Sequence, residues 1–124
     1  MNLQMILPLF TLFSGEEDGQ VFMPLLMTAG EEVRRQLREG ADGSDVRLCY
    51  LVAAVANLRY TQMYGARDKA LATYAGTIAR QSDASQQLRF AQQLVRSYRG
   101  LCADLLCDSE FIFFGMGGAH AGAA

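Results

Sequence analysis

The sequence predicts a mainly α protein: a small helical bundle of about four helices, with a short β-hairpin before the last long helix. Two observations support this fold class. Apolar residues recur at spacings of three and four over most of the chain, which is the period of an amphipathic helix. Hydrophobic residues make up 51% of the 124 residues, which is enough to build the core of one domain. We therefore expect residues 1–114 to form a single helical domain and residues 115–124 to form a mobile Gly/Ala-rich tail.

The first helix is expected near the N-terminus, where apolar residues from Leu3 to Phe13 recur at helical spacing. Pro8 lies inside this pattern, so the helix either starts near Met5 or is short and kinked. The polar run over residues 14–19 then predicts a turn, and three acidic residues lie within it.

A second, amphipathic helix is expected to begin around residues 18–20 and to end at Gly40 as its C-terminal cap. Its apolar face runs from Phe22 to Leu37, and charged residues occupy the opposite face.

The third helix is expected over residues 46–64, after an N-cap at Ser44 or Asp45. It is apolar on almost every side, which predicts burial on most sides. It is therefore either the central helix of the domain or part of a subunit interface.

Residues 70–81 are ambiguous. Thr73, Tyr74, Thr77 and Ile78 favour strands, and the Ala75-Gly76 pair could turn a hairpin. A continued helix is the alternative, and we expect the hairpin.

The last long helix is expected to open at Ser82-Asp83, where Asp83 and Gln86 have capping-box spacing, and to end near Cys107. A short aromatic run follows it. Successive side chains of a strand point to opposite faces, so the four residues of this run cannot all face one core. They either pack across the end of the bundle or form an exposed interface. These interface candidates are Phe111, Ile112, Phe113 and Phe114.

Charge is segregated along the chain, although the net charge is only −2. Residues 1–45 hold eight acidic and three basic side chains, residues 46–100 hold two and eight, and residues 101–124 hold three and none. The basic middle is either a solvated surface paired with acids elsewhere or a contact surface for phosphates or an acidic partner. The candidates for a surface that faces a partner or DNA are Arg80, Arg89, Arg96 and Arg99.

The composition argues against catalysis. The single histidine, His120, lies in the expected tail, so no Ser, His and acid set can be assembled. The cysteines, Cys49, Cys102 and Cys107, lack metal or disulfide spacing and are expected to be small buried residues in a reducing compartment. We therefore expect no catalytic, metal-binding or cofactor-binding site, and no membrane partner, because the longest internal apolar run is far below the ~20 residues that a spanning helix needs.

The order of elements resembles that of the small helical head–tail connector (adaptor) proteins of tailed bacteriophages and prophages. The resemblance rests on the acidic turn, the helix VFMPLLMTAGEEV, the segment LRYTQMY, the segment TYAGTIAR and the ending DSEFIFFG. Pro8 and the Gly/Ala tail depart from the family pattern. The resemblance implies a non-enzymatic ring between portal and tail around the DNA channel. It also implies self-association, portal and tail-completion partners, possible non-specific DNA contact, and location in the bacterial cytoplasm during assembly and then in the virion. The alternative is a small helical binding module or regulator that contacts nucleic acid or a protein.

Overall fold

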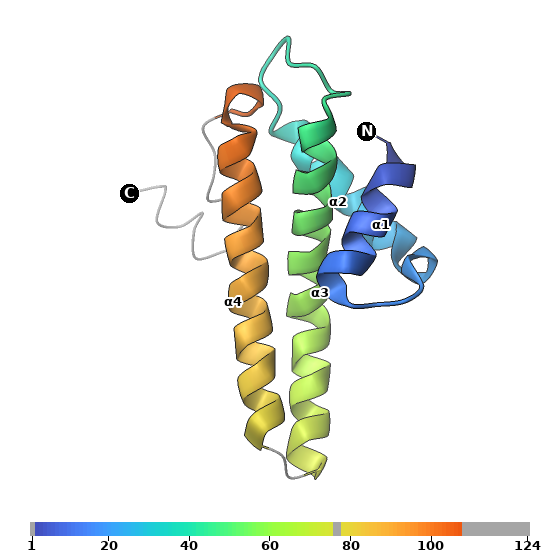
Figure 1. Cartoon of the computed structure of the whole chain (residues 1–124), viewed down its shortest axis with the longest axis vertical. Helices are drawn as coiled ribbons and strands as arrows, with labels where there is room; N and C mark the ends of the chain where they lie inside the picture. Colours follow the sequence, from blue (N-terminus) through green and yellow to red (C-terminus); the bar gives the residue numbers. More distant parts are fainter. Residues whose placement is uncertain (1, 76–77, 108–124) are drawn as a thin grey trace.

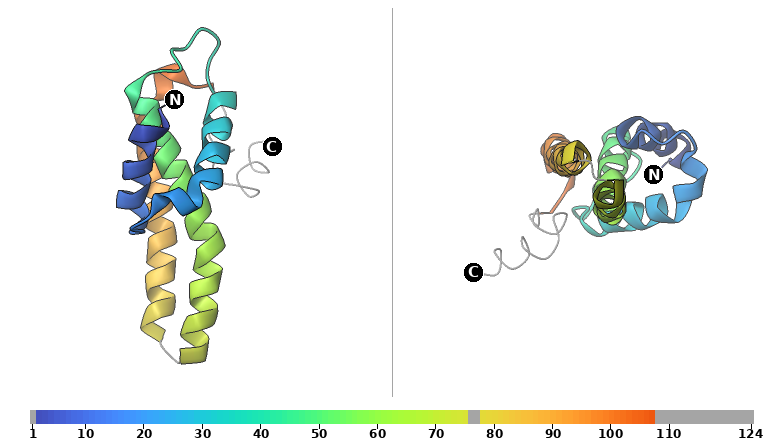
Figure 2. Two further views of the ribbon diagram at one scale, coloured as in Figure 1. Left: turned by 90° about the vertical axis from the view of Figure 1, so that its right-hand side faces the viewer. Right: turned by 90° about the horizontal axis from the view of Figure 1, so that it is seen from below.

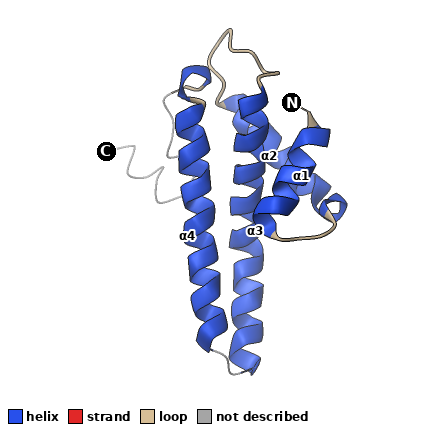
Figure 3. Ribbon diagram, in the orientation of Figure 1, coloured by secondary structure: helices blue, strands red, loops and turns tan. Residues whose placement is uncertain are grey.

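A computed structural model describes residues 2–75 and 78–107 of the chain, and it describes side chains outside residues 65–84. Over these residues the secondary structure consists of helices and loops (Figure 3). The elements are α1 (Leu3–Ser14), η1 (Gly19–Phe22), α2 (Met23–Arg35), α3 (Val46–Ala75), α4 (Ile78–Leu101) and η2 (Ala103–Leu105), where η marks a 3₁₀ helix. The mainly helical prediction is confirmed.

Helices α3 and α4 form a long antiparallel hairpin, and the short helices α1 and α2 pack against one half of α3 (Figure 1). Viewed along the hairpin, α4 lies on one side of α3, and α1 and α2 lie on the other (Figure 2). The remaining half of the hairpin extends beyond the two short helices. The molecule therefore has a packed end and a projecting end.

Helix α3 is the central helix of the packed end. From Leu48 to Leu58 every residue except Tyr50 is buried, and most of these residues are fully inaccessible to solvent. The contacts come from α1, α2 and α4 of the same chain. The apolar surface of α3 is therefore covered within one copy over this stretch, and it does not form a subunit interface there.

The β-hairpin expected within residues 70–81 is wrong. Helix α3 continues to Ala75 and α4 begins at Ile78. Alanines and one leucine dominate residues 66–75, and their strong helix propensity outweighs the strand preference of Thr73 and Tyr74. The helix end expected at residue 64 and the helix start expected at residue 82 are also wrong, because both positions lie inside continuous helices.

Several helix ends differ from expectation or sharpen it. Helix α2 begins at Met23, not at residues 18–20, and α4 ends at Leu101, before the expected end near Cys107. Helix α1 starts earlier than Met5, because the Asn2 side chain caps it, and it continues through Pro8 to Ser14. Helix α3 is capped by Asp45, whose carboxylate accepts the Arg47 backbone N–H at 2.9 Å. Helix α2 ends at Arg35, five residues before Gly40.

Helix α2 stops early because the chain after it pairs with the chain after η2. The Arg38 N–H donates to the Leu105 carbonyl at 2.8 Å, and the Cys107 N–H donates to the Gln36 carbonyl at 2.7 Å. These bonds surround an isolated antiparallel bridge between Leu37 and Leu106. The backbone groups that would continue α2 are thus used to close the packed end of the molecule.

Candidate assembly surfaces

The turn between α1 and α2, residues 15–22, is fixed by local contacts, and we call it the acidic turn. Gly15 adopts a left-handed conformation (φ 81°) that ends α1, and the Glu16 N–H donates to the Ser14 hydroxyl at 3.2 Å. The Asp18 carboxylate accepts the Gln20 N–H at 3.0 Å and caps η1. These contacts define the backbone path of the turn.

Gly19 holds the middle of the acidic turn against α1. It is buried, and a Cβ at this position would lie 2.7 Å from Cδ1 of Leu7 and 2.9 Å from Cγ2 of Thr11. A Cβ here would require the ends of the Leu7 and Thr11 side chains to shift, so glycine lets the turn pack at this distance without that rearrangement.

An aromatic cluster supports the acidic turn from the side of α3. The rings of Phe10, Phe22 and Tyr60 lie 5.3–5.7 Å apart between centroids, and Tyr64 continues the cluster. The Tyr60 hydroxyl donates a hydrogen bond to the Glu16 carboxylate. The edge-to-face geometry and the hydrogen bond join α1, the turn and α3 into one unit.

The acidic turn presents carboxylates next to apolar surface. Glu17, Asp18 and Gln20 are exposed, Val21 is 68% exposed, and Leu12 on the neighbouring turn of α1 is 73% exposed. The sequence holds no lysine or arginine before Arg34. This surface is therefore negative with an apolar component. Its acidic run is evident in the sequence, whereas its apolar part becomes evident only in the fold.

The outer face of α4 has the opposite charge. Arg89, Phe90, Gln93, Arg96 and Leu101 are exposed, and we call these residues the basic α4 face. At 100° per residue they lie within one solvent-facing arc of the helix. Phe90 and Leu101, 51% and 53% exposed, form its apolar edge.

Apolar residues in this segment, which include Ala91, Val95, Leu101 and Cys102, recur at spacings of three and four and predict a buried stripe. The inner face of α4 confirms part of it. Ala91, Val95 and Cys102 are fully buried against the core. Leu101 was expected in this stripe, but it is exposed, so that expectation is wrong. At 100° per residue, Leu101 lies on the same side of the helix as Phe90 and not on the side of Val95. Phe90 has no place in the three-four pattern of the core, and that mismatch is the sequence signal for its exposure.

The structure separates the predicted arginines. Arg89 and Arg96 lie on the basic α4 face, whereas Arg99 is half-buried on another side of the helix. The side chain of Arg80 lies outside the described residues, although its backbone belongs to α4. Residues 108–124, which include the predicted interface residues Phe111, Ile112, Phe113 and Phe114, also lie outside the described residues.

Other arginines of the basic middle pair with acids within the chain. Arg59 forms two hydrogen bonds with the Glu32 carboxylate, at 2.6 and 3.1 Å, and thereby ties α3 to α2. This pairing is one of the two interpretations given for the basic segment. It applies to Arg59.

A second polar contact holds the base of the α3–α4 hairpin. Arg47 contacts the carboxylates of Asp45 and Asp104 at 2.9–3.1 Å and donates to the Leu101 carbonyl at 3.0 Å. Hydrogen bonds from Arg47 lower the pKa of Asp45 and Asp104, and the same contacts raise the pKa of Arg47. We call these three side chains the Arg47 clamp, and it fixes the start of α3 to the end of α4.

The two surfaces lie on opposite sides of α3, and the acidic turn lies level with the first part of the basic α4 face (Figures 1 and 2). The rings of Tyr50 and Tyr98 lie 5.5 Å apart, which sets the antiparallel register of α3 and α4. Tyr60 follows Tyr50 by ten residues along α3, so it lies level with the part of α4 about ten residues before Tyr98. This part is the beginning of the basic α4 face. Since Tyr60 also contacts Glu16, the acidic turn shares this height.

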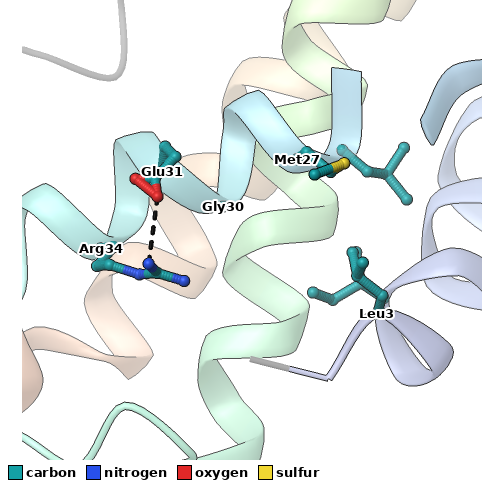
Figure 4. A pocket seen from close by; sticks show the side chains of 7 residues that line it. Leu3, Met27, Gly30, Glu31 and Arg34 are labelled. Atoms are coloured by element: carbon teal, nitrogen blue, oxygen red, sulfur yellow. Dashed lines mark ion pairs between the residues drawn. The ribbon is translucent and has the colours of Figure 1, made fainter. Parts of the chain in front are cut away.

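Two shallow grooves line the packed end. One, of about 200 Å³, lies between α1 and α2, and its charged lining residues Glu31 and Arg34 pair with each other at 3.2 Å (Figure 4). The other, of about 310 Å³, lies beside the acidic turn and is lined by residues that include Val21, Met63 and Tyr64. Both grooves are mainly apolar, and neither brings together the convergent polar groups that are typical of an active site.

The described cysteines divide into two groups. Cys49 and Cys102 are buried, as expected, and burial raises the pKa of the Cys102 thiol to about 11. Cys107 is exposed because the chain has already left the core at this point, so the expectation of burial is wrong for it. Its thiol donates to the Leu37 carbonyl oxygen at 3.6 Å. Among the side chains that the structure describes, no group of three potential metal ligands occurs.

No family model, curated protein or solved structure matches this chain. Within the described ranges, none of the helices is both long enough and apolar enough to cross a membrane. The function of this chain is therefore inferred from its surfaces.

Proposed function

We propose that this chain is a non-enzymatic structural protein that assembles into a homo-oligomeric ring, as a head–tail connector between phage portal and tail around the DNA channel. The observation that carries the proposal is the presence of two chemically opposite surfaces, the acidic turn and the basic α4 face, on opposite sides of one rigid unit. Unlike patches on opposite sides are what a head-to-tail ring requires, since each copy then uses both.

The connector assignment adds partners and a location to ring formation. It comes from the resemblance of element order and implies contact with portal and tail-completion proteins, in the host cytoplasm during assembly and afterwards in the virion. The exposed side chains of Arg89 and Arg96 would then face either a neighbouring copy or DNA in the channel.

The test is to measure the mass of the chain by native mass spectrometry and sedimentation, alone and with purified portal protein from the same genome. A ring of many copies, formed alone or on the portal, is the expected result. A chain that remains a monomer or dimer under both conditions contradicts the proposal. Portal, capsid and tail genes next to the gene for this chain would support the connector assignment.

The second candidate function is a small nucleic-acid-binding module, which the exposed Arg89 and Arg96 favour. Such a module should bind double-stranded DNA at low salt with an affinity that falls as salt rises. Absence of DNA binding at low salt would exclude this candidate and leave the ring proposal unaffected.

A further inference from the structure

We infer that the acidic turn of one copy docks on the basic α4 face of a second copy, so that one repeated contact between unlike surfaces builds the assembly. The inference rests on the proposed function, because it names the surface through which the ring would form. The partner is a second copy of this chain.

Charge complementarity identifies the occupant. Glu17 and Asp18 are exposed on the acidic turn, and Arg89 and Arg96 are exposed on the basic α4 face. Opposite charges across an interface steer association and fix its register. The described side chains of α4, from residue 85 onward, include no acidic residue, so this stretch adds no like-charge repulsion.

Apolar side chains are exposed on both surfaces. Val21 belongs to the acidic turn and Leu12 lies on the helix before it, whereas Phe90 and Leu101 form the apolar edge of the basic α4 face; each of the four is at least half exposed. Exposed apolar side chains rimmed by polar residues are typical of protein interfaces. In the contact these side chains would add apolar burial to the pairing of opposite charges.

Both surfaces are rigid before contact. The acidic turn is held by the Asp18 cap, the buried Gly19 and the bond between Tyr60 and Glu16. The basic α4 face is a regular helix whose end is fixed by the Arg47 clamp. Surfaces that are already ordered lose little conformational entropy on binding, which favours a specific contact.

The shared height of the acidic turn and Arg89 is compatible with a closed ring. A contact between unlike patches repeats a rotation, and an offset along the rotation axis produces a filament instead of a ring. The acidic turn and Arg89 both lie level with Tyr60 of α3. If the turn docks at the Arg89 end of the basic α4 face, copies joined side by side with their hairpins parallel to the axis have little rise, and the assembly can close.

A charge exchange tests this contact directly. The first variant carries Arg89→Glu and Arg96→Glu, which makes the α4 face acidic. The second carries Glu17→Arg, Asp18→Asn and Gln20→Arg, which makes the turn basic and keeps a good N-cap at position 18. Each variant alone would bring like charges together, whereas an equimolar mixture would alternate the two variants and make every contact complementary.

The expected result is that each variant alone self-associates about tenfold or more weakly than wild type, and that the mixture recovers assembly. The measurement is sedimentation of all samples at one ionic strength, alone and on purified portal protein. A matched control, Arg34→Glu with Arg35→Glu, makes the same charge change on exposed positions of α2 and should assemble as wild type does. Circular dichroism melting confirms that each variant is folded.

The outcomes separate the inference from the proposed function. If wild type assembles and neither variant is weakened, or if the mixture fails to recover, the inference is wrong and the ring proposal stands. If wild type assembles neither alone nor on the portal, both are wrong. A control variant that loses assembly as the first variant does would also overturn the inference, because the effect would then follow net charge and not the contact.

Discussion

The two sides of α3 are built in different ways. On one side, two short helices and a non-helical turn cover α3 and are joined by an aromatic cluster, a buried glycine and a hydrogen bond to Glu16. On the other side a single helix, α4, lies along α3 and is fixed at its end by the Arg47 clamp. The first side depends on side-chain contacts to keep its shape, whereas the second depends on the backbone hydrogen bonds of one helix.

This difference determines where substitutions should have an effect. The acidic turn needs interior residues to hold its outward groups in place, so changes beneath it should alter both stability and the shape of the surface. The basic α4 face keeps its geometry as long as α4 remains helical, so changes there should alter charge or contact without altering the fold.

The largest effect is expected from Phe10→Ala. Phe10 is fully buried, and its ring lies 5.6 and 5.7 Å from the rings of Phe22 and Tyr60. Removing it leaves a cavity beneath the acidic turn and should lower the free energy of unfolding by about 3–5 kcal/mol. Urea unfolding measures this loss. Leu12→Ala, on the exposed face of the same helix, is the control and should change stability by less than about 0.5 kcal/mol.

A smaller effect is expected from Tyr60→Phe. The substitution keeps the ring in the cluster and removes the hydroxyl that donates to Glu16. The free energy of unfolding should fall by about 1 kcal/mol, and amide hydrogen exchange should accelerate in the acidic turn. Tyr50→Phe, which removes a hydroxyl on the side of α4, should leave exchange in the turn unchanged. Equal acceleration in both variants would show that Tyr60 does not position the turn.

The Arg47 clamp should make the α4 side sensitive to acid. The pKa values of Asp45 and Asp104 are lowered below 3.8 by hydrogen bonds from Arg47, so the folded chain binds fewer protons than the unfolded chain in this range. The stabilisation is therefore complete above pH 3.8 and is lost as the pH falls through the lower, folded values.

Asp104→Asn tests this dependence. Urea midpoints measured between about pH 5 and pH 2 should fall less steeply for this variant than for wild type. Glu39→Gln, a change at an exposed carboxylate, serves as the control and should follow the wild-type curve. Identical curves for wild type and Asp104→Asn would show that the clamp contributes nothing to acid sensitivity.

Local patterns predicted the packed end well. The stripe of α2 places Leu26, Ala29 and Val33 in the core, and all three are fully buried. The loop composition predicted an N-cap at Ser44 or Asp45, and the cap is formed by Asp45. These features are confirmed because capping and amphipathic burial are decided by residues within a few positions of each other.

Features that depend on distant residues were not predictable from the pattern. The early end of α2 follows from pairing with residues 105–107, about seventy positions later in the chain. The capping-box spacing of Asp83 and Gln86 predicted a helix start there, but both residues lie inside α4, which begins at Ile78 and pairs with α3. For the candidate surfaces, the sequence indicated the acidic turn and Arg89 and Arg96, but the position of these groups on opposite sides of α3 required the fold.

The smallest effect on stability is expected from Phe90→Ser on the basic α4 face. Phe10 and Phe90 are the same residue type, but one is fully buried and the other is 51% exposed. Phe90→Ser should therefore change the free energy of unfolding by less than about 0.5 kcal/mol, unlike Phe10→Ala. If Phe90 belongs to the apolar edge of the copy-to-copy contact, the same substitution should weaken self-association in sedimentation without changing the melting curve of the monomer. Gln86→Ala, on the same exposed side of α4, is the control and should assemble as wild type does. A large loss of monomer stability in Phe90→Ser would place this side chain in the core and remove the apolar edge from the proposed contact.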